Sequence, residues 1–333
     1  MILTNPLFWQ ALKDSGSVDE SRGMKLIEFK ASDSSLITFS KNHSYGEYIF
    51  DWAWADAYQR SGIPYYPKLT SMVPFTPATT PHFWGPTSDW DKLLKLHDEI
   101  LNHHSSAHFL FTTKEEQRFL VENNYIPRLS FQYHFFNEGY SSFDEFLGKL
   151  KNKKAKNIRE ERKFNLKIQR ITGSELTTSH AHEMYDFYLM TLKEKRAIPY
   201  LTREFFENIV RHLPHNILYV RAQDTAGALF YYDENTLYGS YWGAKEYIPN
   251  LHFELCYYQG IEFAIEKKIS VFEAGAQGEH KIARGFRPTL ITSAHKINHP
   301  GFSRAISEYV RDESIEVKTI TEELMELLPY SKN

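Results

Sequence analysis

The spacing of hydrophobic positions changes repeatedly along the first part of the chain, and it predicts helices interleaved with strands. A helical repeat covers residues 5–12, with Asn5 as the capping residue and Pro6 in the first turn. The other helices predicted here are 55–61, 90–103 and 114–123, and the predicted strands are 25–29, 36–39, 108–112 and 129–136. An aromatic run at 45–54 follows the second strand, and the proline-rich segment 65–84 is expected to be extended.

After Gly139 the pattern predicts a second set of elements. Helical repeats occur at 143–150, 180–195 and 202–212, and strand-like runs follow at 217–222, 228–232 and 236–242. Turn-forming residues separate these strands, which predicts an antiparallel meander. The remaining predicted elements are a helix introduced by Pro249 and Asn250, a strand at 269–274, a short helix at 279–284 and a strand at 289–297.

Length and repetition predict two domains. The chain has 333 residues, which exceeds a typical single domain. Tyr45-Gly46-Glu47-Tyr48 in the first part is echoed by Tyr238-Gly239-Ser240-Tyr241 in the second, and a helix is predicted shortly after each. We therefore expect two halves of similar fold, residues 1–138 and residues 139–333, with the reaction core in the second half.

Composition narrows the class of protein. The formal net charge of -3 gives no general attraction for nucleic acid, so no DNA partner is expected. A single cysteine, Cys256, excludes an internal disulfide and cysteine-rich zinc modules. Histidines at 97, 103, 104 and 108 lack a His-Glu-x-x-His pattern, so no metal is expected. Since no apolar run approaches the ~18 residues of a membrane helix, we expect a cytoplasmic protein without membrane insertion. Composition does not specify the oligomeric state.

The segment 275–286 carries the densest candidate chemistry. Gly275 and Gly278 allow a tight turn whose backbone N–H groups can hold an anion. Glu279 and His280 follow at a predicted helix start, where a carboxylate is stabilised and an imidazole can exchange protons near neutral pH. Surface positions for both residues are the alternative interpretation.

Several longer strings resemble one bacterial family. They are His43-Ser44-Tyr45-Gly46-Glu47-Tyr48, Phe50-Asp51-Trp52-Ala53-Trp54-Ala55-Asp56-Ala57-Tyr58, Tyr65-Tyr66-Pro67-Lys68-Leu69, Pro74-Phe75-Thr76-Pro77, His252-Phe253-Glu254-Leu255-Cys256-Tyr257-Tyr258 and the run from Phe272 to Phe286. In these strings the chain resembles, over nearly its whole length, the Fem-like/GNAT group of N-acyltransferases, described as peptidoglycan biosynthesis or recognition proteins. The resemblance implies an α/β (α+β) fold of two tandem GNAT-like (acyl-CoA N-acyltransferase) domains with mixed, largely antiparallel sheets.

The resemblance also implies an enzyme. The implied reaction is the transfer of an acyl or aminoacyl group to an amine by direct attack, on a peptidoglycan precursor or another small amine. No tightly bound cofactor is expected; acyl-CoA is the expected co-substrate, and aminoacyl-tRNA is the alternative donor. The segment 281–286 resembles the Lys-x-x-Lys-Gly-Phe turn of Fem-type aminoacyltransferases. The usual coenzyme A signature is not evident, which counts against acetyl-CoA, and the long coiled-coil arm of many Fem enzymes has no counterpart, which counts against a tRNA-borne donor. A non-catalytic recognition module is a further alternative.

Site residues are predicted in three groups. The catalytic group supplies a base and an acid, and its members are Glu279, His280 and Tyr258. The substrate-binding group combines aromatic rings with polar side chains, and its members are His43, Tyr45, Glu47, Asp51, Trp52, Trp54, Asp56, His252, Glu254, Glu273 and Gln277. The donor-binding group offers backbone N–H groups and cations for phosphates, and its members are Gly275, Gly278, Lys281, Arg284, Lys154 and Arg159. Packing, structural ion pairs and solvated helix faces are the alternative roles.

Overall fold

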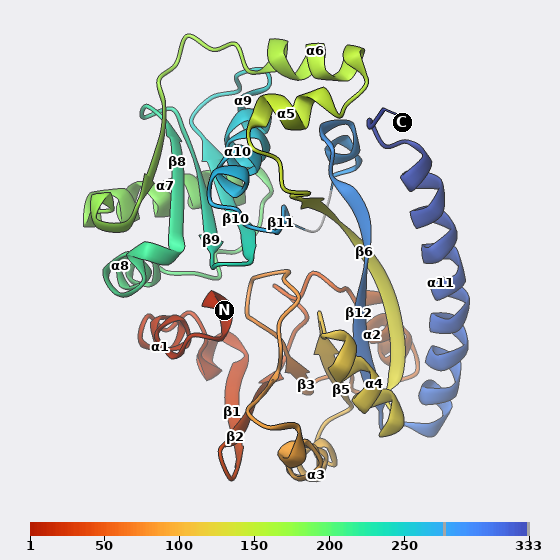
Figure 1. Cartoon of the computed structure of the whole chain (residues 1–333). Helices are drawn as coiled ribbons and strands as arrows, with labels where there is room; N and C mark the ends of the chain where they lie inside the picture. Colours follow the sequence, from red (N-terminus) through yellow and green to blue (C-terminus); the bar gives the residue numbers. More distant parts are fainter. Residues whose placement is uncertain (276–277, 332–333) are drawn as a thin grey trace. The chain divides into compact units, whose positions relative to one another are not determined.

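The computed structural model describes residues 1–275 and 278–331, which form two compact units. Unit 1 comprises Met1–Ser17, Gln132–Thr289 and the C-terminal segment from Glu322, and unit 2 comprises Val18–Phe131 and Leu290–Thr321. This division differs from the halves 1–138 and 139–333, because a segment near each end of the chain packs with the other part. In unit 1, for example, the N-terminal helix α1 (Pro6–Asp14) lies beside α8 (Arg203–His212), with the ring centroids of Phe8 and Phe205 5.9 Å apart (Figure 1).

Unit 1 contains the predicted meander. Besides α1 and α8, its helices are α5 (Phe143–Gly148), α6 (Asn152–Glu161), α7 (Thr178–Glu194), α9 (Leu251–Phe253) and α10 (Gln259–Glu266). Its strands are β7 (Ile168–Thr172), β8 (Ile217–Ala222), β9 (Ala226–Tyr232), β10 (Thr236–Ala244) and β11 (Val271–Glu273). They pair in the order β7-β8-β9-β10-β11, and all these pairs are antiparallel except the parallel pair β10 and β11. The predicted meander is therefore confirmed as β8, β9 and β10.

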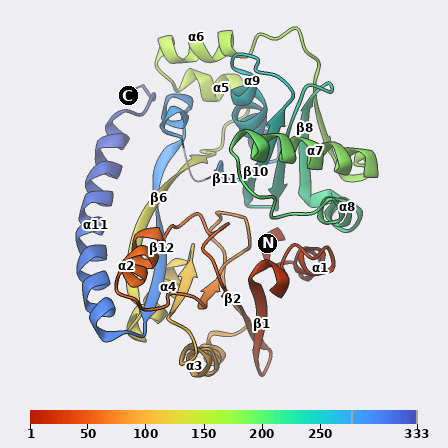
Figure 2. The same cartoon turned by 180° about the vertical axis from the view of Figure 1, so that it is seen from behind.

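Helices cover both faces of the unit 1 sheet. On β9, Leu229 lies with Phe187 of α7, whereas the adjacent Phe230 packs against Gly260 of α10. Neighbouring residues of a strand point to opposite faces of the sheet, so α7 and α10 lie on opposite sides of it. Accordingly, α10 lies in front of the strands in Figure 1 and α7 lies in front of them in Figure 2.

Unit 2 contains a mixed set of paired strands. Its helices are α2 (Trp52–Arg60), α3 (Trp90–Leu101), α4 (Lys114–Glu122) and most of α11 (Pro300–Glu326). Its strands are β1 (Met24–Ala31), β2 (Ser34–Lys41), β3 (Lys68–Ser71), β4 (Phe83–Trp84) and β5 (Ser106–Leu110), with parts of the long strands β6 (Ile126–Phe136) and β12 (Arg287–Ile297). The order is β1-β2-β3-β5-β12, β4 pairs with β2, and β3 is parallel to β5.

The two faces of the unit 2 sheet differ in chemistry. Leu69, Ala107, Phe109 and Ala294 point into an apolar core formed with α3 and α4. The residues that alternate with them are polar and buried, and they are Lys68, Thr70, Ser106, His108, Ser293 and His295. Because the side-chain period of a strand is two, the alternation places these polar groups together on the opposite face.

The mixed α/β class expected from the sequence is confirmed in both units, while the GNAT-like nature of each domain stays a prediction. The aromatic run 45–54 forms a loop that enters α2. Helix α11 was not predicted, because it buries a narrow stripe that includes Ile306 and Val310, which leaves a weak pattern. Within residues 1–275 and 278–331, no helix has both the length and the apolar character needed to cross a membrane.

Candidate functional site

The candidate site of unit 1 begins where β10 and β11 stop pairing. Their parallel register covers Thr236 to Tyr238 of β10, and Tyr238 lies opposite Glu273. Strand β10 then continues to Ala244 after an irregularity between Gly239 and Tyr241. Along the edge of β10 that faces β11, the described pairing therefore ends at Tyr238. The loop after β11 starts at this edge.

Glycines shape the loop that follows β11. Gly275 and Gly278 have φ angles of 83° and 113°, in the region that side chains disfavour. A Cβ atom on Gly278 would lie 2.5 Å from the ring of His280, so this position also lacks room for a side chain. The predicted role of both glycines in holding a donor stays a prediction, and Gln277 lies outside the described residues.

Lys281 is the most perturbed cation of this loop. Its side chain is buried, and Nζ donates a hydrogen bond to the carbonyl oxygen of Gly275 at 2.9 Å. Nζ also lies 6.0 Å and 5.7 Å from the ring centroids of Tyr133 and Tyr257. Within the described part of the chain, no ion pair neutralises it. Burial therefore lowers the pKa of Lys281 to about 7, so both protonation states are populated near neutral pH.

His280 forms the second part of the site. The Oη atom of Tyr257 lies 3.0 Å from Nε2 of His280. Burial and the charges of Arg284 and Lys281 lower the pKa of His280, and burial raises the pKa of Tyr257. At neutral pH the phenol therefore donates to an uncharged imidazole, which has the protonation state of a general base. His252 lies near this pair, with its ring 6.3 Å from that of His280.

Tyr257 belongs to a π-helical turn, Glu254–Tyr258, between α9 and α10. Such turns are rare and often occur at functional sites. The sequence analysis favoured Tyr258 for the catalytic group and did not assign a role to Tyr257. In the structure, it is Tyr257 that bonds to His280. The available sequence signal was that Tyr257 and Tyr258 are adjacent, so that either tyrosine was a candidate for the acid.

Tyr258 and Arg284 share a different partner. The Nη2 atom of Arg284 lies 2.8 Å from Oε2 of Glu161, and the hydroxyl of Tyr258 donates to the same oxygen. The guanidinium of Arg284 also lies 3.4 Å from the ring centroid of Phe253. Both predicted site residues are thus committed to a structural network in this state, and their roles as acid and donor ligand stay predictions.

Other predicted residues of unit 1 differ in burial and in their exposure to solvent. Glu254 is buried and is held by Arg162, at 3.0 Å and 3.1 Å, and by Gln259. Glu273 is buried in β11, whereas Glu279 is exposed at the start of the short helix Glu279–Arg284. An exposed carboxylate beside His280 is available to a substrate, while Glu254 is not.

One predicted donor ligand on α6, Lys154, belongs to a lysine-rich surface, which we define as Lys151, Lys153, Lys154 and Lys156. No ion pair involves these four side chains among the residues that the structure describes, and three of them are exposed. Arg159, by contrast, pairs with Asp144 at 3.4 Å. The helix ends at Glu161, the partner of Arg284, so the lysine-rich surface leads towards the loop that carries Lys281.

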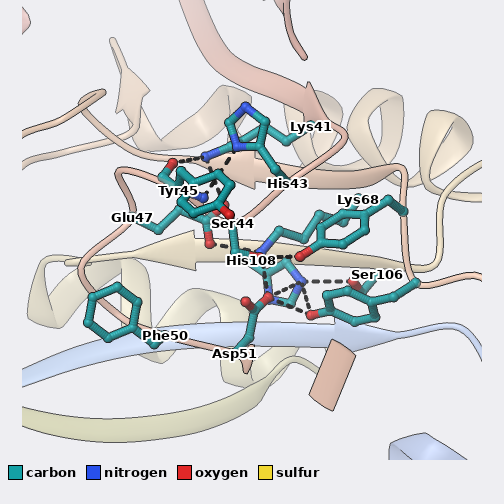
Figure 3. A network of polar contacts seen from close by, with 12 residues as sticks. Lys41, His43, Ser44, Tyr45, Glu47, Phe50, Asp51, Lys68, Ser106 and His108 are labelled. Atoms are coloured by element: carbon teal, nitrogen blue, oxygen red, sulfur yellow. Dashed lines mark hydrogen bonds and ion pairs between the residues drawn. The ribbon is translucent and has the colours of Figure 1, made fainter. Parts of the chain in front are cut away.

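In unit 2, two predicted carboxylates lie in a buried ionic network (Figure 3). Glu47 lies 2.8 Å from Nζ of Lys41 and 2.7 Å from Nζ of Lys68. Asp51 pairs with Lys68 and accepts a hydrogen bond from Tyr65 at 2.6 Å. Burial raises the pKa of Asp51, but the charge of Lys68 outweighs it and holds this pKa well below its usual value. Neither carboxylate reaches the surface, so in this state they stabilise the loop rather than meet a substrate amine.

The same network contains residues that the sequence analysis missed. The Nδ1 atoms of His108 and His295 lie 2.7 Å apart, although the residues are far apart in the sequence. Burial lowers the pKa of His108 to about 3, so this histidine is uncharged. Polar residues at alternating positions in two apolar strands were the only available signal.

The remaining predicted residues of the first part occupy different environments. Tyr45 and Trp52 are exposed and His43 is half-buried. Trp54 is buried in a core with Tyr58 and Ile306, and Asp56 forms an exposed ion pair with Arg60. No group of three or more His, Cys, Asp or Glu side chains within 1–275 and 278–331 has the arrangement of a metal site.

Comparison with known proteins agrees with this architecture. Three of the solved structures that this chain resembles illustrate the similarity. FemX has 10% identity and a TM-score of 0.53, over 92% of this chain and 94% of that chain. L-PGS from Bacillus licheniformis has 10% identity and a TM-score of 0.51, over 92% and 97%. The C-terminal domain of a putative lysylphosphatidylglycerol synthetase from Agrobacterium fabrum has 7% identity and a TM-score of 0.53, over 90% and 95%.

These structural similarities concern the fold, because the identities are low. No curated protein matches the chain. A family described as FemAB-like, with the role peptidoglycan biosynthesis/recognition, matches residues 3–332. The chain therefore belongs to the FemAB-like family.

Proposed function

We propose that this protein is a transferase that moves an aminoacyl or acyl group onto an amine, with the reacting groups at the loop after β11. The observation that carries the proposal is Lys281, a buried lysine beside the pair of His280 and Tyr257, for which the described residues supply no counter-ion. Strongly perturbed ionisable groups cluster at functional sites. The family's description and the peptide-bond chemistry of peptidoglycan precursors point to the same class of reaction.

The unit 1 architecture supports the finer expectation of a GNAT-like core. Its meander is followed by a helix, the parallel strand β11, a short helix and β12. The residue pattern predicted the same order of elements after residue 217, and it is the order of a GNAT-like core.

The proposed reaction needs one group that moves a proton and another that stabilises a negative charge. The acceptor amine attacks the acyl carbon, a C–N bond forms, and the bond from that carbon to the donor oxygen or sulfur breaks. Uncharged His280 accepts the proton that the amine nitrogen loses, and it then gives this proton to the leaving oxygen or sulfur. The charged form of Lys281 stabilises the anion of the tetrahedral intermediate, because a nearby negative charge raises the pKa of a buried lysine.

The lysine-rich surface favours a donor that carries phosphates. Both aminoacyl-tRNA and acyl-CoA meet this requirement. We place aminoacyl-tRNA first because three of these lysines are exposed and none of the four forms an ion pair within the described residues, which leaves several cations for a polyanion. This choice reverses the order expected from the sequence resemblance, in which acyl-CoA came first.

The test is a transfer assay with labelled aminoacyl-tRNA and acyl-CoA donors and a peptidoglycan-precursor acceptor. We expect transfer by the wild type that ribonuclease abolishes, and a loss of about 100-fold in Lys281→Met, the size typical for one oxyanion-stabilising group. Lys193→Met removes an exposed lysine of α7 and should retain full activity. Precursor binding without turnover from either donor would replace the transferase by a recognition protein.

A further inference from the structure

Unit 2 carries exposed aromatic side chains that lie against one another. Tyr45, Phe50 and Trp52 are 50%, 44% and 41% exposed. The ring centroids of Tyr45 and Trp52 are 5.3 Å apart, and Phe50 stacks on Trp52 at 6.2 Å with an interplanar angle of 20°. His43 adjoins Tyr45 at 5.4 Å. We call His43, Tyr45, Phe50 and Trp52 the aromatic platform.

Hydrogen bonds from cationic side chains fix the loop that carries the aromatic platform. The buried ammonium of Lys41 donates to the carbonyl oxygen of Tyr45 at 2.9 Å, and Arg128 donates to the carbonyl oxygen of Phe50 at 2.9 Å. Asp51, adjacent to both Phe50 and Trp52, is fixed by Lys68. Figure 3 shows the ring of Phe50 pointing away from this network. The platform is thus set in place before a ligand arrives.

Backbone geometry adds to this pre-organisation. Gly46 has a φ angle of 77°, and a Cβ atom there would lie 2.6 Å from the ring of Phe75. Tyr48 has a φ angle of 61°, which is uncommon for a residue with a side chain. Such conformations persist only where surrounding contacts determine them, and they concentrate at binding sites.

The platform exposes ring faces and no free charge. The four charged groups beneath it, Lys41, Glu47, Asp51 and Lys68, pair with one another, and Arg128 pairs with Glu313 at 2.7 Å. A nucleic-acid base would also stack on such rings, but its phosphates require cations that are absent from this set of side chains. The uncharged C–H face of a sugar ring matches aromatic faces without that requirement.

We propose that the aromatic platform binds a pyranose ring of an amino-sugar ligand by stacking, as the acceptor-recognition subsite of this protein. The sugar assignment rests on the proposed function and on the family's link to peptidoglycan. The platform lies in unit 2, whereas Lys281 lies in unit 1, so binding and transfer are separable by mutation.

The test is a titration with the trimer of β-1,4-linked N-acetylglucosamine, followed by saturation-transfer NMR and by tryptophan fluorescence. We expect saturable binding by the wild type below about 10 mM ligand, the range of a weak single-ring contact. Trp52→Ala and Tyr45→Ala should each weaken it by about tenfold or more. Tyr309→Ala removes a ring of matched exposure, 51%, on α11 and should bind as the wild type does.

Equal binding by the platform variants and Tyr309→Ala would overturn the proposal, and so would the absence of saturable binding by the wild type. Thermal unfolding of each variant checks that the fold is intact. We expect an intact fold because the substituted side chains are exposed. Lys281→Met should bind the trimer normally. Lys281→Met separates the two proposals. Both are supported if the wild type transfers and Lys281→Met loses transfer but still binds the trimer. Only the platform is supported if the wild type binds the trimer but shows no transfer.

Discussion

At the scale of single residues, burial and ion pairing together decide whether a lysine keeps its charge near neutral pH. Lys281 and Lys68 are both fully enclosed lysines, yet their chemistry differs. Although burial opposes its charge, Lys68 lies between the carboxylates of Glu47 and Asp51, and its pKa is raised. Lys281 has no such partners among the described residues, and its pKa falls to about 7. The same residue type thus forms a permanent structural cation in one unit and a titrating group in the other.

The titration of Lys281 predicts a pH-dependent stability difference. Its pKa is about 7 in the folded chain against an ordinary value of 10.5, so between these values the unfolded chain binds a proton that the folded chain does not. The stability of the wild type therefore rises with pH across this window. Lys281→Met removes the cost of burying the charge, and we expect it to exceed the wild type by ~2 kcal/mol or more at about pH 6.

This advantage should shrink as the pH rises from about 7 towards about 10. Urea unfolding at several pH values measures it, with Lys193→Met as the control whose difference from the wild type does not vary with pH. A constant difference for Lys281→Met would mean that the lysine has an ordinary pKa.

At the scale of elements, a local structural feature in each unit positions its polar side chains. The π-helical turn Glu254–Tyr258 adds a residue to a helical turn and brings Tyr257 to His280. In unit 2, the polar face of β3, β5 and β12 supplies the anchors for the loop before α2. Helix α6 presents the lysine-rich surface because Ala155 and Ile158 turn its apolar side inward.

Helix α6 makes a prediction about the donor. The triple variant Lys153→Gln, Lys154→Gln, Lys156→Gln should bind tRNA about tenfold more weakly near 0.1 M salt, and the slope of log affinity against log salt should fall by about 2. Counter-ions leave the nucleic acid when each phosphate contact forms. A variant that makes fewer contacts releases fewer counter-ions, so its slope is smaller. Filter binding across a salt series measures both quantities.

The matched control for α6 neutralises Lys13, Lys193 and Lys267, which are exposed elsewhere in unit 1. This control should leave the salt slope within experimental error of the wild type. Equal slopes for the two triple variants would place the polyanion site away from α6.

At the scale of the whole molecule, segments distant in the sequence complete each unit. The first residues of the chain belong to unit 1, although residues 18–131 of unit 2 follow them directly. Phe8 is buried there, with its ring 5.9 Å from Phe205 and 5.4 Å from Tyr231. Unit 2 is completed in turn by Leu290–Thr321. Each unit therefore depends on both early and late parts of the chain.

This arrangement predicts where an N-terminal mutation acts. Phe8→Ala should destabilise unit 1 by ~3 kcal/mol, the usual cost of a large cavity. Hydrogen exchange should accelerate in β8 and β9 and stay unchanged in β2 and β5. Leu7→Ala, at an exposed position next to it, is the control and should change neither. Faster exchange confined to residues 18–131 would contradict the division into units.

The sequence by itself determined the elements whose signals are local. Turn residues delimited β8, β9 and β10, and the glycines, Glu279, His280 and Lys281 marked the loop after β11. The mixed α/β class and the family resemblance also followed from the sequence, because alternation, turn chemistry and long motif strings are all read within short windows.

Only the tertiary structure decided which residues meet and what state they are in. Glu47 and Asp51 looked like substrate ligands until Lys41 and Lys68, from two separate strands, were found to neutralise them. His108 met His295, Phe8 joined the later part of the chain, and Tyr257 rather than Tyr258 bonded to His280. Pairing and desolvation depend on distances through space, and the pKa of Lys281 depends on the atoms that exclude water from it. These quantities are absent from any short window of sequence.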